Sequence, residues 1–93
     1  PEEVEEALKL HDAVSDCNVV GIADERWGQA ITAVVQLVDP SVEDEALIRS
    51  VKERLAGYKA PKHIVRVDEL KRQANGKPDY RWATRSAEAA LAV

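Results

Sequence analysis

The sequence predicts a small α/β domain of the α+β kind, with a three-stranded sheet containing an antiparallel hairpin and about three flanking helices. Two runs rich in β-branched residues, 14–22 and 30–38, are separated by the polar turn 24–29, a pattern typical of a β-hairpin. Apolar residues with helical spacing precede and follow this pair. The chain of 93 residues is long enough for one modest core. We therefore expect residues 1–93 to form a single domain.

The first helix is expected over residues 2–10. Four glutamates lie in its first turns, while Lys9 and His11 lie at its end, an order that complements the helix dipole. Its inner face is expected to consist of Val4, Ala7 and Leu8.

The second β-branched run, residues 30–38, is almost continuously apolar, which is typical of a strand covered on both faces. The first run contains Cys17, the single cysteine of the chain, which cannot form an internal disulfide and suits a reducing cytoplasm. We expect Cys17 to be a buried structural thiol, because no activating base accompanies it in the strand.

A second helix is predicted over residues 42–56. Ser41, followed three residues later by Asp44, resembles a capping box, and Gly57 is expected to end the helix. Its buried stripe would consist of Leu47, Ile48, Val51 and Leu55. Residues 63–67 are expected to form a short third strand. The last helix would begin at Pro78 and turn Ala83, Ala87, Ala90 and Leu91 inward.

The segment Asn75-Gly76-Lys77-Pro78 is the strongest candidate for a functional site. Asn and Gly tolerate positive φ, so the chain can reverse tightly and leave Lys77 at the tip. If Pro78 opens a helix, Lys77 also lies near the partial positive charge of that helix's N-terminus. Such a place favours binding of an anion, a phosphate above all. The alternative is an ordinary solvated turn.

The net charge of −4 is unevenly distributed along the chain. Residues 1–58 carry five Lys or Arg against thirteen Asp or Glu, and residues 59–93 carry eight against four. A basic end is expected to bind an anionic ligand or nucleic acid, or else to be a solvated surface. Tyr80 and Trp82 are its only aromatic residues, so stacking residues do not alternate with the charges and we expect no nucleic acid.

The sequence predicts neither a metal site nor a transmembrane segment. His11 and His63 are far apart in the sequence and there is one cysteine, so no zinc-binding pattern exists and we predict no metal site. No apolar run approaches the length of a transmembrane segment.

Four segments, in order, resemble the small C-terminal domain of AMP-forming acyl- and aryl-CoA ligases. This superfamily also includes the luciferases and the adenylation domains of peptide synthetases. Residues 55–61 are similar to the family's L-P-x-Y-x-x-P core motif, and residues 75–81 to its final G-K-x-x-R motif. The other two segments are Pro1–Leu8 and Val19–Gln29. The resemblance covers nearly the whole chain and implies the C-terminal lid domain of the adenylate-forming enzyme fold.

The resemblance implies that Lys77 is catalytic in adenylation, where a substrate carboxylate attacks the α-phosphorus of ATP and pyrophosphate leaves. A lysine that bridges carboxylate and α-phosphate would stabilise the shared negative charge and orient the reactants. Asn75 and Gly76 would then form the nucleotide-binding loop. Acetylation would remove the charge of Lys77, so a lysine acetyltransferase and a deacetylase are further implied partners.

By the same resemblance, Lys52, Tyr58 and Lys59 are candidates for contact with CoA. Trp27 and Gly28 are candidates for the interface with a large N-terminal domain, although Trp27 could equally cover the local core. That large domain would bind most of the ATP and Mg²⁺. We expect the present chain to be a fragment that lacks it and is inactive alone.

The segment Lys71-Arg72-Gln73-Ala74-Asn75 departs from the proline-arginine-threonine-x-x of many acyl-CoA ligases, so the path of this loop stays open. The continuation of the motif at Trp82 and Ala83 resembles that of bacterial fatty-acyl-CoA synthetases. The implied function is a cytoplasmic, AMP-forming ligase of long- or medium-chain fatty acids and CoA. The alternatives are an amino-acid adenylation domain of a peptide synthetase, or a non-enzymatic α/β module that binds protein or nucleic acid through its basic half.

Overall fold

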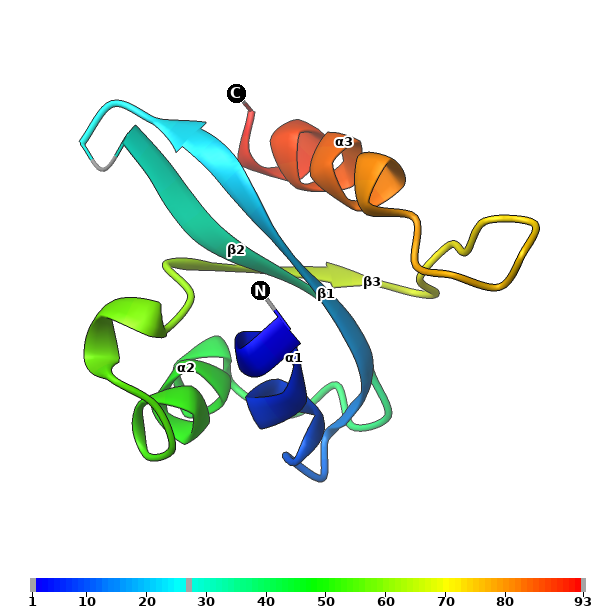
Figure 1. The fold of residues 1–93 in the computed structure, drawn as a ribbon. Coiled ribbons are helices and arrows are strands. Elements are labelled where there is room, and N and C mark those ends of the chain that lie inside the picture. The colour runs from blue at the N-terminus through cyan, green and yellow to red at the C-terminus, as the bar shows by residue number, and fades with distance from the viewer. Residues whose placement is uncertain (1, 27, 93) are drawn as a thin grey trace.

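The computed structural model describes residues 2–26 and 28–92 (Figure 1). Its three strands form one mixed sheet in the order β1-β2-β3, in which β1 and β2 are antiparallel and β2 and β3 are parallel. The strands are β1 (Val14–Asp24), β2 (Gly28–Leu37) and β3 (His63–Val67). The helices are α1 (Glu2–Lys9), α2 (Asp44–Lys52), the short 3₁₀ helix η1 (Gly57–Lys59) and α3 (Tyr80–Leu91). The predicted fold class is confirmed.

The helices cover both faces of the sheet. Figure 1 shows α1 and α2 on one side of the strands and α3 on the other. The larger core cluster joins α1 and α2 to one face through Leu8, Val35 and Leu47, and the smaller one joins α3 to the opposite face through Val34, Val65 and Ala87. Strand β2 is therefore buried on both faces, as its apolar run predicts.

Strand β1 contains an irregularity that redirects one side chain. Val14 pairs with Leu37 but Asp16 pairs with Gln36, so Ser15 is an extra residue in the ladder. Val14 and Cys17 consequently share the face that α1 covers, although they are three residues apart. Asp16 between them contacts Arg72, which lies in the segment between β3 and α3, and β-bulges commonly redirect a side chain in this way.

Helix α2 is shorter than predicted, and the expected capping box is wrong. The hydroxyl of Ser41 donates to Asp39 Oδ1 at 2.6 Å and so stabilises the preceding turn instead of the helix. The N-cap is Glu43, without a side-chain cap. The helix ends at Lys52, and Gly57 begins η1 rather than ending α2. Leu47 and Val51 are buried as expected, and Ile48 and Leu55 pack against them partly buried.

Helix α3 begins at Tyr80, two residues later than predicted. Asp79 is the N-cap, because its Oδ1 accepts a hydrogen bond from the Trp82 N–H at 3.0 Å. Pro78 precedes the helix and lies opposite Arg72 in an isolated β-bridge. Ala83 and Ala87 are buried and Leu91 packs against their cluster, but Ala90 is exposed, contrary to expectation.

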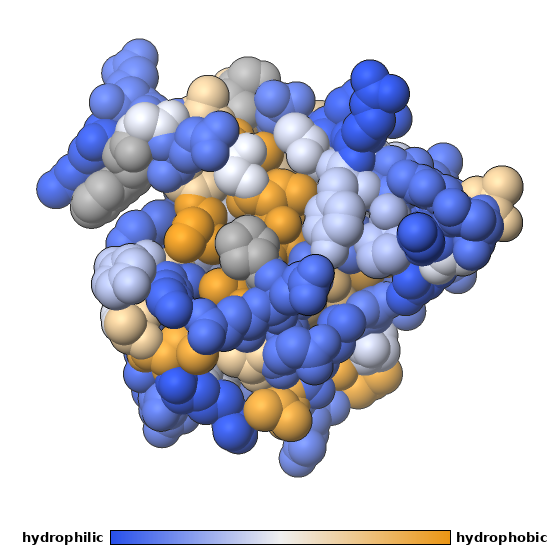
Figure 2. Space-filling model, in the orientation of Figure 1, coloured by the Kyte–Doolittle hydropathy of each residue, from blue (hydrophilic) through white to orange (hydrophobic). Residues whose placement is uncertain are grey.

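Hydrophilic residues cover most of the face shown in Figure 2, including the end that carries the segment between β3 and α3. Within the described parts of the chain, every helix is too short or too polar to cross a membrane.

The core position of Leu47 gives a first prediction. Its side chain is 0% exposed between α2 and the sheet, so Leu47→Ala should lower the free energy of unfolding by about 2–5 kcal/mol. Leu10, which is 61% exposed, is the control, and Leu10→Ala should change it by less than about 0.5 kcal/mol. Urea unfolding of the domain measures both, and equal losses would contradict the packing described.

Candidate functional site

The candidate lysine lies in a compact turn between β3 and α3. Gln73 N–H donates to the carbonyl of Lys77 at 2.8 Å, and Gly76 N–H donates to the carbonyl of Gln73 at 2.8 Å. Gly76 has a φ of +86°, a conformation that favours glycine. The Asn75 side chain completes the turn by accepting the Lys77 N–H at 3.0 Å. We call residues 72–78 the lysine loop.

The structure leaves the ammonium of Lys77 exposed and without an ion-pair partner among the residues it describes. Because Asp79 caps α3, Lys77 lies two residues before the N-cap and not at the first turn. Its backbone N–H and carbonyl are both hydrogen-bonded within the loop. The backbone is thus held in place while the charge is free to meet an anion.

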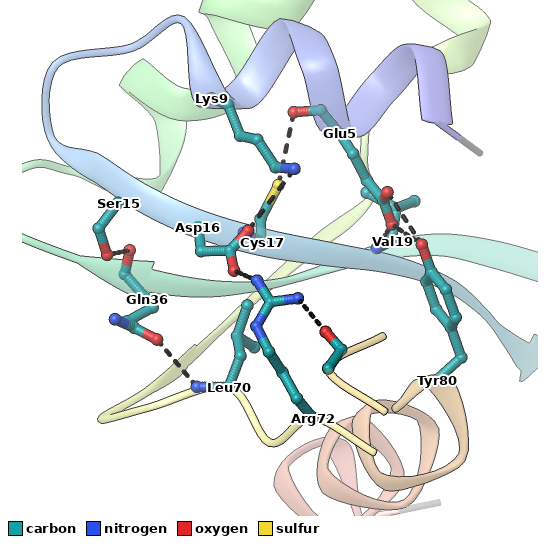
Figure 3. A network of polar contacts seen from close by, with 11 residues as sticks. Glu5, Lys9, Ser15, Asp16, Cys17, Val19, Gln36, Leu70, Arg72 and Tyr80 are labelled. Carbon is teal, nitrogen blue, oxygen red and sulfur yellow. Dashed lines mark hydrogen bonds and ion pairs between the residues drawn. The ribbon is translucent and has the colours of Figure 1, made fainter. Parts of the chain in front are cut away.

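An ion pair ties the lysine loop to the sheet (Figure 3). Arg72 Nη2 lies 2.5 Å from Asp16 Oδ2, and Arg72 Nη1 donates to the carbonyl of Gly76 at 3.2 Å. Asp16 is itself held by the Cys17 N–H at 2.9 Å and by Lys9 Nζ at 3.6 Å. One guanidinium therefore connects β1 to the residue that precedes Lys77.

A second polar contact anchors the chain just beyond the loop. The Tyr80 hydroxyl lies 3.0 Å from both carboxylate oxygens of Glu5, and Glu5 Oε2 also accepts the Val19 N–H at 2.7 Å. Glu5 is buried. Burial and the hydrogen bond to Glu5 raise the pKa of Tyr80 to about 12, which keeps the phenol protonated as a donor.

The residues proposed for CoA lie apart from Lys77. Figure 1 shows η1 near one end of β3 and the lysine loop near the other. Tyr58 is 75% exposed, and Lys52 is exposed at the end of α2. Lys59 Nζ forms an ion pair with Glu3 Oε1 at 2.6 Å, and this hydrogen bond raises the pKa of Lys59. Its ammonium is therefore already engaged, unlike that of Lys77.

Two other candidates lie near the hairpin and at the end of α1. Trp27 lies outside the described residues, and Gly28, with a φ of +77°, begins β2 at an exposed position. His11 Nδ1 accepts the Ala13 N–H at 3.1 Å, so its side chain completes the turn after α1. No cluster of metal-binding side chains occurs within residues 2–26 and 28–92.

Cys17 is buried, as predicted, and its Sγ donates to the carbonyl of Glu5 at 3.6 Å. Burial, followed by the nearby Glu5 carboxylate, raises the pKa of the Cys17 thiol to about 12. A thiol with so little thiolate is a poor nucleophile, which supports a structural role.

Sequence reasoning missed the polar residues that support the loop, namely Glu5, Asp16, Arg72 and Tyr80. Glu5 had one available signal: it lies beside Val4 and near Leu8 on the inner face of α1, where a carboxylate requires a partner. The Asp16–Arg72 pair had no such signal, because 56 residues separate its members.

Comparison with known proteins identifies the family of the chain. Residues 3–77 match the family model described as AMP-binding enzyme C-terminal domain. The 3-oxocholest-4-en-26-oate–CoA ligase of Rhodococcus rhodochrous is 52% identical over 84 residues, which cover 89% of this chain and 15% of that protein.

Two mycobacterial proteins extend the comparison. A Mycobacterium tuberculosis medium/long-chain-fatty-acid–CoA/3-oxocholest-4-en-26-oate–CoA ligase is 50% identical over 92 residues, covering 96% of this chain and 16% of that protein. A solved Mycobacterium tuberculosis fatty acyl CoA synthetase superimposes with a TM-score of 0.90 at 28% identity, covering 97% of this chain and 18% of that chain. The chain thus spans less than a fifth of each of these proteins.

The raised pKa of Cys17 gives a second prediction. At pH 8 the thiolate fraction in the folded domain should be about 10³-fold smaller than in the unfolded chain, so Ellman's reagent should react quickly only after addition of urea. By linkage, the stability that Cys17 contributes is fully present below its unfolded pKa of 9.0 and is lost as the pH rises towards about 12. Rapid reaction of the native protein, with Cys17→Ser as the unreactive control, would contradict the burial.

Proposed function

The chain belongs to the family of AMP-binding enzyme C-terminal domains, and on this premise we propose that it is the C-terminal domain of an AMP-forming acyl-CoA ligase. The names of the Rhodococcus and Mycobacterium relatives, at 52% and 50% identity, support this activity. They also support a medium- or long-chain fatty acid, or a steroid-derived carboxylic acid, as substrate. The observation that carries the proposal is the hydrogen-bonded loop that presents the exposed ammonium of Lys77.

We propose that Lys77 acts in the first half-reaction. There the acid's carboxylate oxygen bonds to the α-phosphorus of ATP, and the bond to the bridging oxygen of pyrophosphate breaks. Negative charge is shared among the carboxylate, the α-phosphate and the leaving group, so a positioned cation stabilises the transition state. In the second half-reaction the CoA thiol displaces AMP from the acyl adenylate, and this step needs no further charge from Lys77.

Asn75 and Gly76 shape the loop in this proposal. The Asn75 carboxamide oxygen is occupied by the Lys77 N–H, and the Gly76 carbonyl faces Arg72. They would therefore determine where Lys77 meets the nucleotide. Lys52 and Tyr58 remain the candidates for CoA, while Lys59 would first have to leave Glu3.

A large N-terminal domain of the same protein would hold ATP, Mg²⁺ and the acid. Trp27 and Gly28 are the residues we propose at its interface. The exposed ammonium of Lys77 is also accessible to a lysine acetyltransferase, and acetylation would remove the charge that adenylation needs.

Neither alternative function has comparable support. The relatives named as CoA ligases favour a CoA acceptor over an amino-acid adenylation domain of a peptide synthetase. A module that binds nucleic acid through its basic half would need a continuous free cationic surface. Instead, Lys59, Arg66 and Arg72 are held in ion pairs with acidic residues of the domain.

Substitution of Lys77 tests the proposed role. In the full-length ligase, Lys77→Ala should lower the rate of acid-dependent exchange of pyrophosphate into ATP by about 10²–10³-fold, because a charge-stabilising group is lost. Transfer from preformed acyl-AMP to CoA should change far less. Lys71→Ala is the matched control, since Lys71 is an exposed lysine of the same segment. Comparable losses of Lys77→Ala in both half-reactions would refute the assignment.

The isolated domain provides a separate test. It has a complete core but lacks a glycine-rich phosphate loop in its sequence, so it should unfold cooperatively on heating and catalyse no pyrophosphate exchange. Robust exchange by residues 1–93 alone would contradict the proposed division between two domains.

A further inference from the structure

We propose that Asp16 and Arg72 are positioning residues that set the place of Lys77 for adenylation. This inference rests on the proposed function, because it assigns a task to the residues around the same loop. It is drawn from the ion pair between the loop and β1 shown in Figure 3.

Arg72 contacts both the sheet and the turn. Its Nη2 binds Asp16 at 2.5 Å, while Nη1 of the same planar group donates to the Gly76 carbonyl at 3.2 Å. The Gly76 carbonyl belongs to the peptide bond that leads into Lys77. A guanidinium with two donors in fixed geometry can hold both acceptors, whereas an ammonium is a single point charge. The direction of the Lys77 backbone is therefore tied to the position of Asp16.

Asp16 has other contacts that hold its carboxylate in place besides the one with Arg72. The β-bulge at Ser15 turns its side chain towards the lysine loop, and its Oδ1 accepts the Cys17 N–H at 2.9 Å. Lys9 Nζ lies 3.6 Å from the same oxygen. Asp16 Oδ2 is thereby directed at Arg72. The position of the lysine loop is therefore set by its contact with β1.

Other contacts hold the ends of the segment but do not reach the turn. Before the loop, the Leu70 N–H donates to Gln36 Oε1 at 2.9 Å. After it, the Tyr80 hydroxyl contacts Glu5. Arg72 is thus the one described side chain that links the turn beside Lys77 to the sheet. Loss of the pair should leave the fold intact and release the tip.

The expected consequence is catalytic and not structural. Partly exposed ion pairs contribute little to stability, and the side chains of Arg72 and Asp16 are 49% and 21% exposed. By contrast, a displacement of a catalytic group by about 1 Å can lower a rate about 10²-fold. Substitution should therefore lower the kcat of adenylation while the large domain still determines KM for ATP and acid.

The experiment uses the full-length ligase with Asp16→Asn, Arg72→Gln and the double variant. Each single change should lower kcat for pyrophosphate exchange by about 10–100-fold, with KM values changed by less than about 2-fold. Transfer from preformed acyl-AMP to CoA should stay within about 2-fold of wild type. The double variant should be no slower than the slower single variant, because both substitutions remove one interaction. Arg72→Lys should fall between wild type and Arg72→Gln, since it keeps a charge but not two donors in fixed geometry.

Asp44→Asn is the matched control. It removes another partly exposed arginine–aspartate pair, Arg66–Asp44 at 2.8 Å, which does not contact the lysine loop. It should leave both half-reactions within about 2-fold of wild type. An equal loss of adenylation in Asp44→Asn, additive losses in the double variant, or equal loss in both half-reactions would overturn the positioning role.

Lys77→Ala in the same assay separates the two proposals. If Lys77→Ala abolishes exchange while Asp16→Asn and Arg72→Gln exchange at the wild-type rate, the positioning role fails and the function of Lys77 stands. If Lys77→Ala exchanges at the wild-type rate, the proposed function itself fails. The thermal unfolding midpoints of Asp16→Asn and Arg72→Gln should equal that of wild type. If lowered midpoints account for the loss of pyrophosphate exchange, the positioning role is overturned.

Discussion

The buried carboxylate of Glu5 joins the three parts of the fold on which the lysine loop depends. It belongs to α1, accepts the Val19 N–H of β1 at 2.7 Å and accepts the Tyr80 hydroxyl of α3 at 3.0 Å. A buried carboxylate is tolerated where donors surround it, and removal of a donor leaves an unpaired charge. The carboxylate therefore holds α1 and the start of α3 against the same strand, and the lysine loop comes immediately before Tyr80.

The sequence allowed prediction of the elements that local patterns determine. Strand β3 was predicted over residues 63–67, as observed, because a short apolar β-branched run follows Pro61. The burial of Cys17 followed from its place in a strand. Lys77 could be identified as a candidate because Asn75 and Gly76 permit a tight turn, and because the motif resembles a known family. These features are encoded by neighbours in the chain.

The rest depends on competition between local groups or on distant contacts. Ser41 is predicted to cap α2, but its hydroxyl donates to Asp39 instead. A sequence pattern does not show whether such a side chain bonds to the helix or to the preceding turn. Pro78 suits the first turn of a helix, yet Asp79 caps α3 and moves its start. The Asp16–Arg72 contact needs both the bulge in β1 and the return of the chain after β3. No local pattern contains that information.

Lys59 and Lys77 show what such distant contacts do for chemistry. Both are lysines near a turn, but Lys59 is paired with Glu3, so its charge is satisfied within the domain. At Lys77 the anchoring is done by other groups, namely the Asn75 carboxamide and the Arg72 guanidinium, which bind the N–H and the carbonyl of the peptide bond between Gly76 and Lys77. A cation that stabilises a transition state must be placed accurately without being neutralised by its support. The anchoring groups are a neutral carboxamide and a guanidinium, and the Lys77 ammonium that the proposed reaction requires forms no ion pair with an acidic side chain of residues 2–26 and 28–92.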